Sequence, residues 1–322
     1  MIRRRELAAG AAAAALLPGL PRAQERWPTA PIRWLIGYAA GGASDIFARM
    51  IAGHMSQAFG QPVVVENRPS AGAIVATEAA VRSPPDGHTV LHVDNGIVVY
   101  NPAFYSRLPF DPDRDLQPVG GIGRFSFFLV VRADSPFRTA QDLIAAARTR
   151  QLNCGIPVVG APHHMAVALF MRRAGFEMQT IAYRGSPPMV QALLSGEIDC
   201  AAVDANATVP NVQAGRARAL VCWSAERARA LPDVPTAAEV GVPDCVADGW
   251  MGLCVPTGTP PARIARLNEV LNIALRADDV QRQMTLSGGT TLNMTPAQFG
   301  EFIRAESALW RPLIREMGIR MD

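Results

Sequence analysis

The 322-residue chain contains no lysine, and all 31 of its basic residues are arginine. These arginines are dispersed, so no basic run typical of nucleic-acid binding is present. Beyond the N-terminal region, no apolar run is long enough to cross a bilayer. The formal net charge is only +3. We therefore expect no nucleic-acid partner and no membrane-spanning helix in the mature protein, and we attribute the missing lysine to genomic base composition.

Common catalytic and metal motifs are also missing. The chain has no Gly-x-Ser-x-Gly motif, no phosphate-binding loop and no dinucleotide fingerprint. Its five cysteines match no zinc spacing, although Cys245 and Cys254 could pair in an oxidising compartment. His163 and His164 lack a carboxylate or cysteine at ligand spacing, which favours a histidine that donates one hydrogen bond at a helix start. The sequence predicts no catalytic residue, no metal and no cofactor.

The N-terminus has the layout of an export signal. Arg3, Arg4 and Arg5 precede the apolar stretch Leu7–Leu20, which is too short to span a bilayer. The segment Arg4-Arg5-Glu6-Leu7-Ala8 resembles a twin-arginine signal. Residues 1–25 are therefore predicted to direct the chain to the periplasm.

The rest of the chain alternates short apolar runs with helical patterns, which predicts an α/β fold. We expect two lobes, each a mainly parallel sheet flanked by helices, with a ligand cleft between them. Residues 26–125 together with 248–322 form the first predicted lobe, and residues 126–247 form the second. No flexible linker rich in glycine, proline or serine separates them, so strands are expected to cross between the lobes.

One stretch near the start of the first lobe predicts a binding site for a small anion. The apolar run Ile32–Tyr38 ends at a turn containing Gly41 and Gly42, and a helical pattern then begins at Ser44 and Asp45. A helix start presents free N–H groups and a favourable dipole, and glycines let a ligand approach them. An ordinary turn between a strand and a helix explains the same residues. Asp45 is expected to cap the helix rather than bind ligand, and Ser44 suits either role.

The second half of the chain repeats this arrangement. Cys154–Met165 combines a strand end, a turn with Gly160 and a helix start. In open parallel sheets, ligands bind at the carboxyl ends of the strands, so the two helix starts should face each other across a cleft. Other strand ends should border it, and we interpret Tyr38 and Tyr183 as wall residues or as edge packing. The candidate ligand-binding residues are Tyr38, Gly41, Gly42, Ser44, Asp45, Asn95, Gly96, Val159, Gly160, Ala161, His164, Tyr183, Asp204 and Asn206.

Motifs spread over the whole mature chain resemble one family of receptors. They are Trp27-Pro28, Ala40-Gly41-Gly42 with Asp45, Gly60–Arg68, Pro85-Asp86-Gly87, Tyr183-Arg184-Gly185, Leu231–Thr236 and Gly258-Thr259-Pro260. This pattern resembles the Bug family, the TctC-like periplasmic receptors of tripartite tricarboxylate transport systems. The resemblance implies a two-lobed receptor that closes on a carboxylate held mostly by main-chain N–H groups, hydroxyls and waters at the two turns.

The second turn departs from the family pattern, which usually reads G-S-A-G-x-G-S-x-x-H. Gly155, Gly160 and His164 keep their places, whereas apolar residues replace four others, namely Ile156, Pro157, Val158 and Ala161. Two hydroxyl donors and one N–H are lost, and each buried ligand group left unpaired costs about 1–3 kcal/mol. We therefore expect a ligand with one carboxylate and a less polar remainder, either aromatic or branched.

The sequence thus predicts a monomeric periplasmic binding protein, not an enzyme, for a small organic carboxylate. Its expected partners are the membrane permease subunits of a tripartite tricarboxylate-type system or a sensor kinase. Two alternatives stay open: a receptor that only feeds a two-component sensor, and a periplasmic enzyme that transforms the acid in the same cleft.

Overall fold

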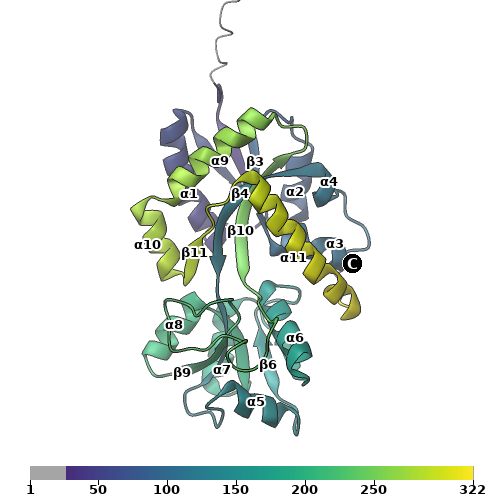
Figure 1. Ribbon diagram of the computed structural model, residues 1–322, viewed down its shortest axis with the longest axis vertical. Helices are drawn as coiled ribbons and strands as arrows, with labels where there is room; N and C mark the ends of the chain where they lie inside the picture. Colours follow the sequence, from purple (N-terminus) through teal and green to yellow (C-terminus); the bar gives the residue numbers. More distant parts are fainter. Residues whose placement is uncertain (1–26, 322) are drawn as a thin grey trace, which may run out of the picture.

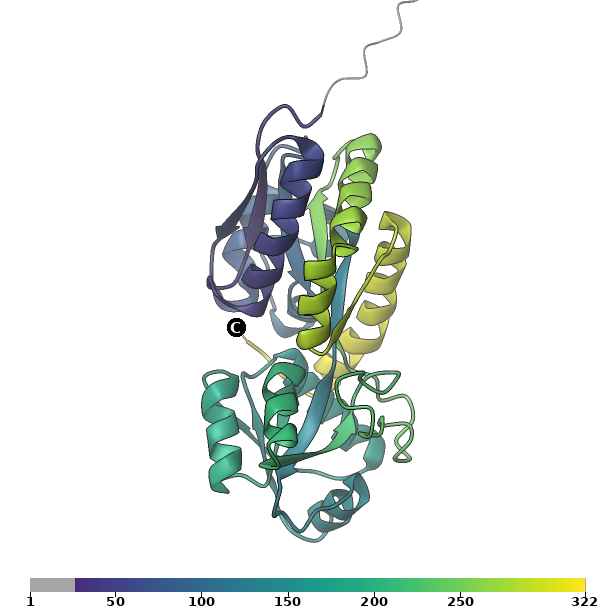
Figure 2. The same cartoon turned by 90° about the vertical axis from the view of Figure 1, so that its left-hand side faces the viewer.

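The computed structural model describes residues 27–321, which form two lobes stacked along the long axis of the molecule (Figures 1 and 2). One lobe contains a six-stranded sheet of order β11-β4-β10-β3-β1-β2, and the other a five-stranded sheet of order β7-β6-β8-β5-β9. The two-lobed fold expected from the sequence is therefore confirmed. The predicted export signal, residues 1–25, lies outside the described residues.

The first lobe combines both ends of the described chain. Its strands are β1 (Ile32–Ile36), β2 (Val63–Asn67), β3 (Thr89–Asp94), β4 (Leu116–Phe125), β10 (Gly249–Pro256) and β11 (Gly289–Thr291). Its α-helices are α1 (Ala43–Phe59), α2 (Ile74–Val81), α3 (Asn101–Phe104), α4 (Pro112–Asp115), α9 (Pro261–Leu275), α10 (Asp278–Leu286) and α11 (Pro296–Glu316). A 3₁₀ helix, η2 (Ala71–Ala73), and a π-helix, η3 (Asn95–Tyr100), complete the lobe.

The second lobe is built from the middle of the chain. Its strands are β5 (Phe127–Arg132), β6 (Asn153–Ile156), β7 (Gln179–Ala182), β8 (Cys200–Asp204) and β9 (Ala217–Cys222). Its helices are α5 (Ala140–Ala147), α6 (Pro162–Ala174), α7 (Ser186–Ser195) and α8 (Ala205–Gln213).

Both sheets are mixed rather than mainly parallel. The βαβ units predicted from the sequence do form parallel pairs, β1 with β2 and β3, and β6 with β7 and β8. The strands that lead between the lobes run antiparallel to their neighbours: β10 to β3 and β4, and β5 to β8 and β9. Two neighbouring strands run parallel only when a crossover connection, usually a helix, returns the chain to the same end of the sheet. β5 and β10 enter their sheets directly from the other lobe, and they pair antiparallel to their neighbours.

The chain crosses between the lobes at two points. At the first, only Ser126 separates β4 from β5. At the second, Asp248 directly precedes β10, which carries the chain back into the first sheet. Figure 1 shows β4 and β10 running side by side toward the second lobe.

Side chains from both lobes also pack into one shared apolar cluster. Phe104 and Trp310 of the first lobe belong to it together with Met165 and Phe170 of α6. The lower end of α11 lies beside α6 (Figure 1), where Arg172 and Glu316 form an ion pair of 2.5 Å. The lobes are therefore in contact along α11 as well as at the crossings.

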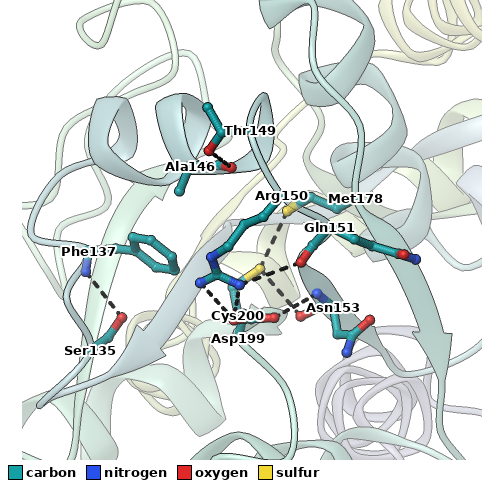
Figure 3. A network of polar contacts seen from close by, with 10 residues as sticks. All are labelled: Ser135, Phe137, Ala146, Thr149, Arg150, Gln151, Asn153, Met178, Asp199 and Cys200. Carbon is teal, nitrogen blue, oxygen red and sulfur yellow. Dashed lines mark hydrogen bonds and ion pairs between the residues drawn. The ribbon is translucent and has the colours of Figure 1, made fainter.

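A polar network holds the outer end of the second sheet (Figure 3). The Asp199 carboxylate accepts hydrogen bonds from the backbone N–H of Asn153, at 2.8 Å, and from the Arg150 guanidinium, at 3.3 Å. That guanidinium also lies 5.7 Å from the centre of the Phe137 ring. The network ties the start of β6 to the start of β8, far from the other lobe.

The cysteines are unpaired. All five, including Cys245 and Cys254, are free and buried, so these two do not form the disulfide that the sequence left open. Burial raises the pKa of the Cys245 thiol to about 12. Cys254 lies in the central strand β10, where it pairs with β3 and β4, and its thiol is covered by the core. These cysteines act as small apolar residues.

None of the helices in the described part of the chain combines the length and apolar content that a membrane crossing requires.

His92 on β3 provides a stability test of the first lobe. The ring is fully buried beside Trp34, and neither nitrogen has a hydrogen-bond partner among the described residues. Burial lowers its pKa to about 4, against about 6.5 in the unfolded chain. The unfolded state therefore binds the extra proton first as the pH falls through this window, which favours unfolding.

We expect the wild-type protein to lose roughly 3 kcal/mol more stability than the His92→Leu variant between pH 7 and pH 4. Urea denaturation of both proteins at the two pH values measures this difference. Equal losses in the two proteins would show that His92 titrates normally in the fold.

Candidate ligand-binding site

The glycine turn after β1 is exposed, and its geometry requires glycine at one position. Gly41 has a φ of +82°, in the left-handed region. Gly42 then takes an extended conformation and occupies the N-cap position of α1, which begins at Ala43. Neither Ser44 nor Asp45 is the N-cap, because the chain enters the helix earlier than the sequence pattern predicts.

Asp45 lies inside the first turn of α1 and fills part of the expected anion site. Its carboxylate accepts a 2.9 Å hydrogen bond from the Gly41 N–H and pairs with Arg49, one turn later, at 2.9 Å. The hydrogen bond from Arg49, with that from Gly41, lowers the pKa of Asp45 to about 2. The Gly41 amide is therefore already occupied by a protein carboxylate.

The second turn is satisfied in the same way. The Gly160 N–H donates a 3.1 Å hydrogen bond to Nδ1 of His164, which therefore accepts rather than donates as the sequence suggested. Burial lowers the pKa of His164, which favours the neutral ring that this bond needs. Gly160 has a φ of +77° and packs against Phe104, so this turn touches the first lobe.

A cavity of about 220 Å³ lies between the lobes. Residues from both sheets line it, and α1 and α6 both begin at its wall, as the repeated junctions predicted. The lining residues are Ala43, Phe47, Asp94, Asn95, Phe125, Ser126, Phe127, Pro162, His163, Asp204, Asn206, Gly249, Trp250, Met251 and Ser287.

Three of the residues predicted from the sequence line this cavity: Asn95, Asp204 and Asn206. The other predicted residues lie outside its lining, and they are Tyr38, Gly41, Gly42, Ser44, Asp45, Gly96, Val159, Gly160, Ala161, His164 and Tyr183. The structure brings these strand ends and helix starts together, but the residues that line the cavity are often their neighbours in sequence.

The two tyrosines illustrate this difference. The Tyr38 hydroxyl donates a 2.5 Å hydrogen bond to Asp94, and that aspartate in turn accepts from the Ile97 N–H. Burial raises the pKa values of both Tyr38 and Asp94. The Tyr183 hydroxyl lies 3.5 Å from Glu197, outside the cavity lining. Tyr38 therefore lies outside the cavity lining and holds the lining residue Asp94 in place.

Asn95 joins two strands at the cavity wall. Its side-chain amide donates to the Asp248 carbonyl at 3.1 Å and accepts from the Trp250 N–H at 2.9 Å. Both hydrogen-bonding ends of this side chain are used by the start of β10. We therefore assign Asn95 to holding the wall.

Asp204 and His163 bring polar groups to the second-lobe side of the cavity. Asp204 caps α8 by accepting a 3.0 Å hydrogen bond from the Ala207 N–H. The His163 ring packs on Phe127 with ring centres 4.0 Å apart. Neither of its nitrogens has a hydrogen-bond partner among the described residues, contrary to the single donated bond expected from sequence.

Sequence reasoning missed most of the apolar wall. Phe125 and Phe127 flank the first crossing, and Trp250 and Met251 follow the second. The expected crossing of strands between the lobes could have indicated these residues, because the strands that cross between two lobes line the cleft between them. Trp250 packs against Phe299 in the core, with ring centres 5.7 Å apart, and it also reaches the cavity.

Comparison with known proteins identifies the family. A family model described as "Tripartite tricarboxylate transporter family receptor", TctC, matches residues 47–319. The chain belongs to the TctC receptor family. Proteins of this family are periplasmic receptors that bind small carboxylates and work with transporter subunits, so the resemblance seen in the sequence motifs is confirmed.

Two relatives align with this TctC receptor over nearly its full length. The "UPF0065 protein in tcbD-tcbE intergenic region" of Pseudomonas sp. strain P51 is 37% identical over 98% of this chain and 95% of its own length. Protein BugT of Bordetella pertussis is 31% identical over 94% of this chain and 93% of its own length.

Two solved structures from Rhodopseudomonas palustris share the fold. Rpa4515, solved with adipate, is 30% identical with a TM-score of 0.79, covering 91% of this chain and 99% of that chain. MatC, solved with bound malate, is 27% identical with a TM-score of 0.75, covering 89% of this chain and 100% of that chain.

A second cavity of the TctC receptor, of about 250 Å³, also lies at the lobe junction. Arg124 and Asp248 line it, and their side chains lie 3.3 Å apart. Burial raises the pKa of Asp248 to about 6, and the Ser224 hydroxyl donates to its carboxylate. Glu226, Arg227 and Arg229 also line this cavity, whereas the first residues of both α1 and α6 line the cavity of about 220 Å³. We take the cavity beside the helix starts as the candidate site.

The bond between Gly160 and His164 predicts a measurable effect on stability. The His164→Ala variant leaves a buried N–H without an acceptor, so its free energy of unfolding should fall by about 1–3 kcal/mol. The His164→Asn variant is the matched control, because its side-chain oxygen can accept the same hydrogen bond. Urea denaturation should place His164→Asn closer to wild type than His164→Ala. Equal losses in both variants would show that this bond does not hold the turn.

Proposed function

We propose that this chain is a periplasmic binding protein that captures a small monocarboxylate with an aromatic or other apolar body. The observation that carries the proposal is the composition of the cavity between the lobes. Four aromatic side chains line it, Phe47, Phe125, Phe127 and Trp250, and none of the described lining residues is an arginine. Apolar surface supplies most of the binding energy in such a pocket, and few polar groups orient the ligand.

The ligand carboxylate is proposed to lie at the start of α1. The first N–H groups of a helix have no intrahelical acceptor, and the helix dipole favours an anion there. Ala43, the first residue of α1, lines the cavity, whereas the Gly41 amide is occupied by Asp45. The start of α6 is the poorer anion site, since its first residue, Pro162, has no N–H to donate.

A second carboxylate would meet an unfavourable environment in this cavity. The only ionisable carboxyl groups among the described lining residues are Asp94 and Asp204, and no lysine or arginine there compensates them. Like charges at short range repel, and desolvating an unpaired carboxylate is costly. We therefore infer that this receptor differs in preference from the relatives solved with adipate and malate.

The mechanism we propose is closure of the two lobes on the ligand. Residues 26–125 with 248–322, and residues 126–247, would move as two bodies about the crossings at Ser126 and Asp248. Closure surrounds the ligand with groups from both lobes and removes it from water. The receptor, exported by residues 1–25, would act as a monomer and deliver the acid unchanged to the permease subunits of a tripartite tricarboxylate-type system.

Ligand preference tests this proposal directly. Benzoate and related aromatic monoacids should raise the melting temperature, with about 2.7 kcal/mol of stabilisation when the ligand is a hundredfold above its Kd. Adipate and malate should give a smaller shift at equal concentration. Mass spectrometry after long incubation should recover the acid unaltered. Tight malate binding without any response to monoacids, or a converted product, would contradict the proposal.

Ala43 tests the position of the carboxylate. The Ala43→Leu variant places a larger side chain in the cavity at the start of α1, and we expect its affinity for the best monoacid to fall more than about tenfold. Ala40→Leu is the matched control, because Ala40 lies in the same exposed turn outside the cavity lining. Isothermal titration calorimetry measures both variants. Unchanged affinity in Ala43→Leu would place the ligand elsewhere.

A further inference from the structure

The His163 side chain is an unusual feature of the cavity wall. The ring is held against Phe127, and both of its nitrogens are buried without a hydrogen-bond partner among the described residues. Buried polar groups in folded proteins almost always have partners, so an unpaired ring that lines a ligand cavity points to a partner on the ligand.

Asp204 lies opposite this ring. One of its oxygens accepts from the Ala207 N–H, and the other, Oδ2, accepts from the Ser186 hydroxyl at 3.1 Å. Oδ2 lies 4.0 Å from Nε2 of His163, which is too far for a direct hydrogen bond. An oxygen atom placed about 2.8 Å from both atoms would bridge them at an angle of about 90°, close to hydroxyl geometry.

We propose that His163 and Asp204 together recognise a hydroxyl group on the ligand, so that the receptor prefers a hydroxy-substituted carboxylic acid. The inference rests on the proposed function, and it names the ligand class more narrowly. In the bound state, the ligand hydroxyl donates its hydrogen to Asp204 and accepts one from the neutral imidazole of His163. The carboxylate at α1 and this hydroxyl at the second lobe hold the two ends of an apolar body.

The chemistry of the pair selects among other groups. A carboxylate at this position has no hydrogen for Asp204 and repels it, whereas a carbonyl or ether lacks the hydrogen altogether. An ammonium group carries hydrogens for Asp204 but no acceptor for an imidazole N–H, and its charge must be desolvated among aromatic side chains. Burial lowers the pKa of His163 to about 4, so the ring is neutral near pH 7. A hydroxyl is the group that both donates and accepts without a charge.

The first arm of the test compares ligands on the wild-type protein. Isothermal titration calorimetry with benzoate, 4-aminobenzoate and the three hydroxybenzoate isomers should show one isomer binding at least about tenfold more tightly than benzoate. If benzoate binds as tightly as every hydroxybenzoate, or 4-aminobenzoate binds most tightly, the hydroxyl inference is wrong while the proposed function stands. If no aromatic acid binds, the proposed function itself fails.

The second arm removes the pair. His163→Phe keeps a ring on Phe127 and deletes both nitrogens, and Asp204→Asn keeps an oxygen that can cap α8. In each variant, the affinity ratio of the best hydroxybenzoate to benzoate should fall toward one. The same substitution at His54 of α1, a half-buried residue that pairs with Asp279 outside the cavity lining, is the matched control and should retain the wild-type ratio.

Circular dichroism checks that the variants are folded. His163 lies in α6 and Asp204 ends β8, so either variant tests the proposal if the other one fails to fold. A wild-type ratio in folded His163→Phe or in folded Asp204→Asn would overturn the proposal.

Discussion

The candidate site depends on how the two strand crossings are held together. Ser126 at the first crossing is hydrogen-bonded to Ser224 at 2.7 Å, and Ser224 in turn donates to Asp248 at the second crossing. Asn95 joins the end of β3 to the residues on both sides of Gly249. Because the same residues adjoin or line the cavity, any movement of one lobe against the other reshapes the wall that faces the ligand.

The residues that hold the two glycine turns are different from the residues that line the cavity. Asp45 and His164 each satisfy the N–H of a turn glycine, so both turns are held before any ligand arrives. The residues that line the cavity at the two helix starts are instead their sequence neighbours Ala43 and His163. A turn whose amide is already paired keeps its shape at no cost to a ligand, which would make the start of α1 a preorganised site for the proposed carboxylate. The family motif therefore marks the scaffold of the site more than the atoms that contact the solute.

The apolar side of the cavity is where the proposed ligand preference of this chain would be set. Relatives with the same fold have been solved with adipate and with malate. In this chain, Phe125 and Phe127 border the first crossing and His163 packs on the second of them. Under the proposed function, the start of α1 holds the carboxylate, and the residues along the crossing strands set the shape and polarity of the rest of the cavity.

The sequence by itself determined the βαβ units, the two-lobed division and the placement of α1 and α6 at strand ends. These features follow from local periodicity, glycine turns and helix starts, which are encoded within short segments. Only the tertiary structure decided that Asp45 accepts from Gly41, that His163 is left unpaired beside Asp204, and that Phe125, Trp250 and Met251 form the cavity wall. The Gly41–Asp45 bond is local, but several geometries of a glycine turn are compatible with its sequence. The other contacts join residues far apart in the chain, so they depend on how β4, β5 and β10 cross between the lobes, and no local pattern specifies that geometry.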